Sequence, residues 1–74
     1  MDGELLNEKI RVERKLFSFE LRENPRGRFL RIVEDVGGRK DAIIIPSTGL
    51  KEFRDVINRA IETDETVSDE TDQG

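Results

Sequence analysis

The chain contains no cysteine, histidine, tryptophan or tyrosine among its 74 residues. The lack of cysteine excludes disulfides, and the lack of both cysteine and histidine excludes the usual structural zinc sites. The commonest general base and the commonest thiol nucleophile are also missing, so we expect no enzyme, no metal and no cofactor. Because a domain of this size buries too little surface to be stable easily alone, self-association is the stabilising device that remains.

Long apolar runs are absent as well. No segment approaches the roughly 20 apolar residues that a membrane-spanning helix needs. The first residues, Met1-Asp2-Gly3-Glu4, lack the basic start of a signal peptide. These features favour a cytoplasmic protein that does not bind membranes.

The net charge of −4 conceals an uneven distribution along the chain. Residues 62–74 contain six acidic side chains and no lysine or arginine, whereas residues 9–40 contain ten basic and five acidic ones. A basic segment followed by an acidic tail is compatible with binding to a polyanion.

Apolar and polar residues alternate with period two in three segments, residues 9–13, 17–22 and 29–33, which predicts three strands. Residues 42–45 are a fourth predicted strand, closed by Pro46. Two of the connections have turn chemistry, Asn24-Pro25-Arg26-Gly27 and Gly37-Gly38.

The period changes after Pro46. Leu50, Phe53, Ile57 and Ile61 recur at spacings of three and four, which predicts an amphipathic helix over residues 50–62. The residues that follow are polar, acidic and free of aromatics, as in disordered segments. We therefore expect a flexible lead-in over residues 1–7, a folded repeat over 8–62 and an acidic disordered tail over 63–74.

The predicted fold class is α+β, a four-stranded antiparallel sheet followed by one C-terminal helix. One helix covers only one face of such a sheet, so the other face meets water, a partner or a ligand. The residues expected under the helix are Phe17, Phe19, Leu21, Leu30 and Ile32. Strand alternation then places Ser18, Glu20, Arg22, Asn24, Phe29 and Arg31 on the open face, with Arg26 and Arg28 near the turn.

Phe29 is the unusual member of this open face, an aromatic residue within a cluster of arginines. Proteins that bind single strands use guanidinium groups to follow phosphates and aromatic rings to stack on bases. Asn24 adds an amide that is able to hydrogen-bond a base edge. An exposed phenylalanine can equally be packed under arginine stems with no ligand, and the pattern alone leaves both interpretations open.

The run Arg22-Glu23-Asn24-Pro25-Arg26-Gly27-Arg28-Phe29-Leu30-Arg31-Ile32 resembles the signature of the PUR repeat, the module of the purine-rich-element-binding (Pur-alpha) family. The resemblance extends over about residues 5–62 and includes the Gly37-Gly38-Arg39 turn and Glu52-Phe53-Arg54-Asp55. It implies a ββββα repeat with a PC4- or Whirly-like fold. For a chain with one repeat, it also implies a homodimer in which two chains form one intertwined PUR domain.

The same resemblance implies binding to single-stranded DNA or RNA, with a preference for purine-rich sequences, and a location in the cytoplasm or on the nucleoid. It assigns Arg22 and Asn24 to the Lys-x-Asn element of the family, Arg26 to the next basic position and Phe29 to base stacking. Ser18 stands where the family often has an aromatic. The predicted nucleic-acid-binding residues are Arg22, Asn24, Arg26, Arg28, Phe29 and Arg31. The predicted dimer interface is Leu50, Phe53, Val56, Ile57 and Ile61.

A second hypothesis is a dimeric protein-interaction scaffold, whose open sheet face binds an acidic protein partner. The two hypotheses differ in the part played by Phe29, since an acidic protein would tolerate the loss of base stacking. The sequence does not choose between DNA and RNA as the target, and it does not predict duplex unwinding.

Overall fold

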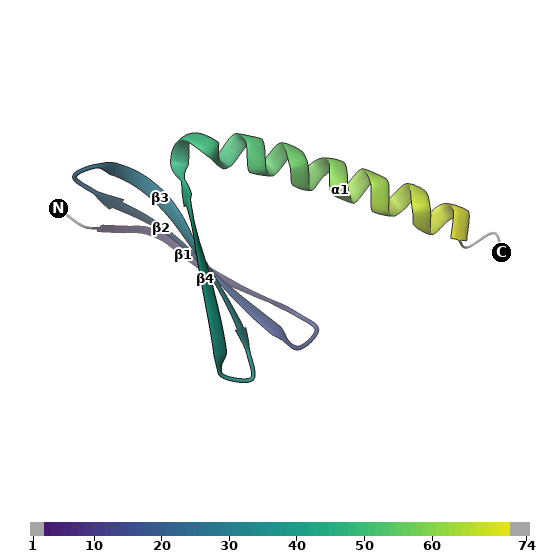
Figure 1. The fold of residues 1–74 in the computed structure, drawn as a ribbon, viewed down its shortest axis with the longest axis horizontal. Coiled ribbons are helices and arrows are strands. Elements are labelled where there is room, and N and C mark those ends of the chain that lie inside the picture. The colour runs from purple at the N-terminus through teal and green to yellow at the C-terminus, as the bar shows by residue number, and fades with distance from the viewer. Residues whose placement is uncertain (1–2, 72–74) are drawn as a thin grey trace.

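The computed structural model describes residues 3–71 of the chain. Its elements, in chain order, are β1 (Gly3–Val12), β2 (Lys15–Asn24), β3 (Gly27–Val36), β4 (Arg39–Pro46), the 3₁₀ turn η1 (Ser47–Gly49) and α1 (Leu50–Thr71). The strands form one antiparallel sheet in the order β1-β2-β3-β4, and the helix follows the last strand (Figure 1). The predicted four-stranded antiparallel sheet with one C-terminal helix is confirmed.

Both predicted glycine turns are confirmed. Asn24 pairs with Gly27 across the β2–β3 turn, and Gly27 has a φ of 138°. The β3–β4 turn places Gly37 and Gly38 at φ values of 60° and 91°. Glycine is suited to both turns because it adopts these positive φ values without strain, whereas L side chains rarely adopt them.

The ends of the fold differ from the prediction. Strand β1 begins at Gly3, so the described part of the expected lead-in, residues 3–7, is in the sheet. The register shifts between Glu4 and Leu6, and the extra residue, Leu5, interrupts the period of two that would have revealed the strand. Residues 1 and 2 of the lead-in lie outside the described residues.

The helix also continues past Glu62 to Thr71, where the sequence had predicted disorder. Residues 63–71 contain neither glycine nor proline, so nothing in them breaks a helix that is already formed. Thr66 Oγ1 donates a hydrogen bond to the carbonyl oxygen of Glu62, 2.9 Å away. Residues 72–74 of the expected tail lie outside the described residues.

The helix does not cover the sheet of its own chain. It leaves the sheet at η1 and projects away from both faces (Figure 1). The radius of gyration is 15.8 Å, against about 11 Å for a compact chain of this length. The expected helix-covered face is therefore open within one chain, which corrects the prediction that α1 packs on Phe17, Phe19, Leu21, Leu30 and Ile32.

The hydrophobic core of a single chain is correspondingly small. Within residues 3–71, Ile45 is the one buried hydrophobic residue, with 3% of its surface exposed. The apolar side of α1 is open, since Phe53 is 48% and Ile57 is 56% exposed. Within the same residues, no helix is long and apolar enough to cross a membrane.

Candidate nucleic-acid interface

The strand register divides the side chains of the sheet between two faces. Phe19 lies opposite Ile32, and Arg22 lies opposite Phe29. Directly opposed residues of antiparallel strands point to the same face, and neighbours in a strand point to opposite faces. Phe29 is therefore on the face away from Phe19 and Ile32, as the sequence predicted.

Charge separates the two faces further. The face that carries Phe29, called the basic face below, has five basic strand residues: Lys9, Arg11, Arg22, Arg31 and Lys40. Its acidic strand residues are Glu4, Glu20 and Asp35, so its net charge is +2. The other face, called the apolar face, carries three basic and four acidic strand residues, a net of −1. Among the strand residues, the net positive charge therefore lies on the basic face.

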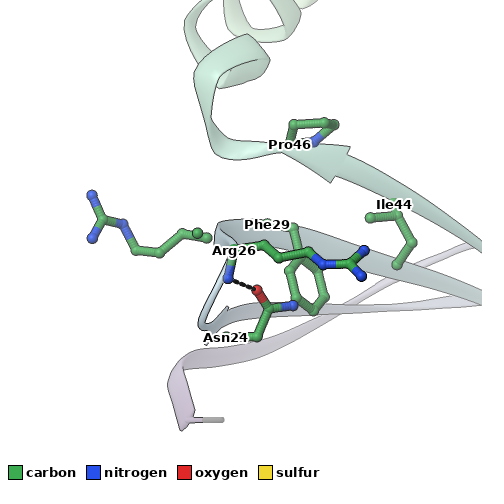
Figure 2. Close-up of a pocket in the computed structure, with 7 residues that line it drawn as sticks. Asn24, Arg26, Phe29, Ile44 and Pro46 are labelled. Atoms are coloured by element: carbon green, nitrogen blue, oxygen red, sulfur yellow. Dashed lines mark hydrogen bonds between the residues drawn. The ribbon is translucent and has the colours of Figure 1, made fainter. Parts of the chain in front are cut away.

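A pocket at the β2–β3 end of the basic face surrounds Phe29 (Figure 2). Its volume is about 520 Å³, and Ile44 and Pro46 of β4 form part of its wall. Phe29 pairs with Pro46 in the sheet register, which brings the aromatic ring and the proline to one end of the sheet. An apolar wall beside a half-buried ring is a surface on which a flat nucleobase can stack.

Asn24 shapes the turn that borders this pocket. Its Oδ1 accepts a hydrogen bond from the backbone N–H of Arg26 at 2.9 Å (Figure 2), the side-chain turn that asparagine commonly forms. The amide nitrogen has no hydrogen-bond partner among residues 3–71. Asn24 thus uses its side-chain acceptor in the turn and leaves its side-chain donor unpaired within the described residues.

An ion-pair network lies beside the pocket on the same face. Glu20 Oε1 is 3.4 Å from Arg22 Nη1 and 3.7 Å from Arg31 Nη1, and Arg22 Nη1 is also 3.7 Å from Glu4 Oε1. The Glu20 side chain is 21% exposed, against 37% for Arg22 and 42% for Arg31. One carboxylate therefore holds two arginines side by side at the surface, with their remaining N–H groups open to solvent.

Arg28 does not join this group. It pairs in register with Glu23, and its Nη1 lies 3.3 Å from Glu23 Oε2 on the apolar face. Although Arg28 is among the residues that line the Phe29 pocket, strand alternation turns its guanidinium to the other side of the sheet. The sequence analysis grouped Arg28 with the binding residues because it is near the turn, but its place directly before Phe29 in β3 puts the two side chains on opposite faces.

Comparison with known proteins identifies the family of this chain. The family described as PurA ssDNA and RNA-binding protein matches residues 1–73. The chain belongs to the PurA family. The resemblance to the PUR repeat is thereby confirmed.

Curated relatives of this PurA-family chain include Transcription factor Pur-alpha 1 of Arabidopsis thaliana, which is 44% identical over 64 residues, 86% of this chain and 22% of the relative. The Transcriptional activator protein Pur-alpha of Mus musculus is 33% identical over 60 residues, 80% of this chain and 19% of the relative. The chain thus spans about a fifth of the length of these relatives.

In this PurA-family chain, the structure brings Arg22, Asn24, Arg26, Phe29 and Arg31 to one end of one sheet face. Sequence reasoning missed Ile44 and Pro46, which complete the pocket from β4. The run of three isoleucines in β4 gave no period from which to choose a face. The sequence indicated only that Pro46 ends this strand. The register places Ile44 opposite Arg31, and therefore on the basic face.

Proposed function

We propose that the protein binds single-stranded nucleic acid, DNA or RNA, on the basic face of the sheet and prefers purine-rich sequences. The observation that carries this proposal is the position of Phe29. Of the three phenylalanines in the strands, it alone lies on the basic face, in an open pocket bordered by arginines. The description of the family as ssDNA- and RNA-binding proteins supports the same conclusion.

Each side chain of the proposed site has a different role. Phe29 stacks on a base, and the wall formed by Ile44 and Pro46 limits the orientation of that base. Arg26 forms no ion pair within residues 3–68, where side chains are described, so its guanidinium is available for a phosphate at the turn. Asn24 donates its free amide N–H to a base edge.

The paired arginines contribute through charge. Arg22 and Arg31 exchange part of their contact with Glu20 for contact with the phosphate backbone. A phosphate is a competitive partner because hydrogen bonds between charged groups are the strong ones. Arg28 is left out of the proposed site because its guanidinium lies on the apolar face with Glu23.

The proposed active form is a homodimer. Both the apolar face of the sheet and the apolar side of α1 are open in one chain, and the two surfaces have the same chemical character. In a dimer each open apolar surface is covered by the other kind, because α1 of one chain packs on the apolar face of its partner. This leaves the basic faces of both chains free for nucleic acid.

Titration of fluorescein-labelled oligonucleotides tests the proposal. The panel is a purine-rich and a pyrimidine-rich sequence, each as single-stranded DNA, as RNA and as a DNA duplex. We expect the single strands to bind, the purine-rich ones more tightly, and the logarithm of the binding constant to fall linearly with the logarithm of salt concentration.

Arg26→Ala should reduce that salt slope by about 0.7, because one phosphate contact to a single strand is lost. Arg59→Ala in α1 removes the same charge far from the proposed site and serves as the matched control. Failure of every oligonucleotide to bind at low salt would reject nucleic-acid binding. Tight binding of an acidic peptide in that case would favour the protein-interaction scaffold.

A further inference from the structure

The basic face has a second depression that the Phe29 pocket does not include. It has a volume of about 300 Å³ and is lined by residues of all four strands. The lining residues are Asn7, Lys9, Leu16, Ser18, Glu20, Arg31, Val33, Asp35 and Lys40. All of them lie on the basic face by register, and we call this depression the lysine groove.

The two lysines of the groove are available to a ligand. Lys9 on β1 and Lys40 on β4 are exposed, and neither side chain forms an ion pair or hydrogen bond with residues 3–68, the range whose side chains are described. They stand on the two edge strands, so they flank the groove from opposite sides. Cations placed in this way can hold an anion that lies across the sheet.

The acidic residues of the groove are already engaged. Glu20 contacts Arg22 and Arg31, as described above. Asp35 Oδ1 accepts a hydrogen bond from the backbone N–H of Gly38 at 2.9 Å, which holds the β3–β4 turn. The carboxylates thus have internal partners, while the ammonium groups of the groove do not.

Small and uncharged side chains lie in the middle of the groove, between the lysines. Ser18 and Val33 lie opposite each other in the centre, and Leu16 lies at the end of the groove near the β3–β4 turn. The Ser18 hydroxyl has no hydrogen-bond partner within residues 3–71. Side chains of this size leave room for a sugar and its phosphates to lie on the sheet.

The groove lies next to the Phe29 pocket on the same face, since Arg31 of the groove pairs with Ile44 of the pocket wall. Arg31 lines the groove and is two residues from Phe29 along β3. At about 3.4 Å per residue, the Phe29 row of the sheet is roughly 14 Å from the Lys9 row and about 20 Å from the Lys40 row. One extended strand of nucleic acid can therefore cover both sites, passing over Arg31.

We propose that the lysine groove is a second nucleic-acid subsite, in which Lys9 and Lys40 hold backbone phosphates of the same strand whose base stacks on Phe29. This inference rests on the proposed function and extends it from a single stacking pocket to a path across the whole sheet. It makes affinity depend on oligonucleotide length, because only a strand long enough to leave the pocket reaches the lysines.

A comparison of two oligonucleotide lengths tests the subsite. A stacked purine trinucleotide spans about 7 Å between its end bases and reaches the pocket alone, whereas a dodecanucleotide of the same composition reaches both sites. Each is titrated into the wild-type protein, the double variant Lys9→Gln/Lys40→Gln, and the charge-matched control Lys51→Gln/Arg59→Gln in α1. Binding is followed by NMR for the trinucleotide and by fluorescence anisotropy for the dodecanucleotide.

The double variant should bind the trinucleotide as the wild type does and the dodecanucleotide more weakly. Its salt slope for the dodecanucleotide should be lower by about 1.4, since two phosphate contacts are lost. Raising the salt from 50 to 200 mM should then cost the wild type about sevenfold more affinity than the variant. The control variant should have the salt slope of the wild type, apart from the small change that its altered net charge causes.

Equal slopes for the two double variants would overturn the subsite while leaving the Phe29 site in place. An equal loss for both oligonucleotides would also overturn it, because the lysines would then act on the field or the fold and not on the path of the strand. If the wild type binds neither oligonucleotide, the proposed function itself has failed and the subsite with it.

Discussion

Replacing Phe53 with alanine should weaken self-association of the protein by about a thousandfold. Phe53 leaves 48% of its surface exposed in one chain, which is about 100 Å² of the roughly 200 Å² that a phenylalanine can bury. At about 25 cal/mol per Å², and allowing for the Cβ atom that alanine keeps, its burial contributes about 2 kcal/mol per chain. A two-fold dimer loses this contribution twice, about 4 kcal/mol or three factors of ten in Kd.

Sedimentation equilibrium over a wide concentration range measures this change directly. The wild type should have the mass of a dimer at micromolar concentration, and Phe53→Ala should dissociate at a concentration about a thousandfold higher. The matched control is Arg59→Ala, which lies on the same helix and has a comparable helix propensity, and which should leave the Kd unchanged. Circular dichroism reports whether the helix persists in each variant.

Two results would show that α1 does not form a dimer interface. A wild-type protein that sediments as a monomer at micromolar concentration with full helicity would show that the open apolar surfaces need no partner. A Phe53→Ala protein that dimerises as tightly as the wild type would show that the apolar side of α1 lies outside the interface.

Three further outcomes are expected. Glu20→Gln should tighten oligonucleotide binding at low salt by about 1.4-fold to fivefold, since ion pairs at the surface are worth about 0.2–1 kcal/mol. This gain in affinity should disappear at high salt. Weaker binding in an anisotropy titration would mean that the carboxylate orients its two arginines instead of competing with phosphate. Gly27→Ala should destabilise the fold by about 1–3 kcal/mol in a urea melt, because a φ of 138° is strained for alanine. Beyond Gly27 and its two chain neighbours, the added Cβ would meet no atom within 4 Å, so backbone strain is the cause. An unchanged midpoint would contradict this prediction. The hydrogen bond from Lys15 to Glu34, together with the charge of that carboxylate, raises the pKa of Lys15 above 10.5. The stabilising effect of this ion pair is therefore complete below pH 10.5 and is lost as the pH rises through the pKa of Lys15 in the folded protein. An NMR titration should show a lower pKa for Lys15 in Glu34→Gln than in the wild type.

The period of two in the strands predicted much of this fold and of its site. It placed Phe29 and Arg31 on one face and Phe19 and Ile32 on the other, and the register agrees. It failed where one residue breaks the alternation, as Leu5 does in β1. A bulge changes the face of every residue before it, so the period cannot show the strand on both sides of the bulge.

The position of the helix could not be predicted from the pattern of one chain. The spacing of Phe53, Ile57 and Ile61 shows that α1 has an apolar side, but it does not show which chain supplies the surface beneath it. The β4 isoleucines are a similar case, since Ile43, Ile44 and Ile45 are alike in composition and differ only in register. The pocket wall formed by Ile44 and Pro46 therefore became visible only when β4 was paired with β3.

Binding of a single strand to the basic face is best tested by the affinity and stability of Phe29→Ala. We expect a loss of about 1–3 kcal/mol in affinity for a purine-rich single strand, with an unchanged salt slope, because stacking and not charge is removed. The thermal melt should stay that of the wild type, whereas Phe19→Ala on the apolar face should lower stability by roughly 3–5 kcal/mol. Unchanged affinity in Phe29→Ala, or loss of its fold while Phe19→Ala stays fully stable, would show that a single strand does not bind by stacking on the basic face.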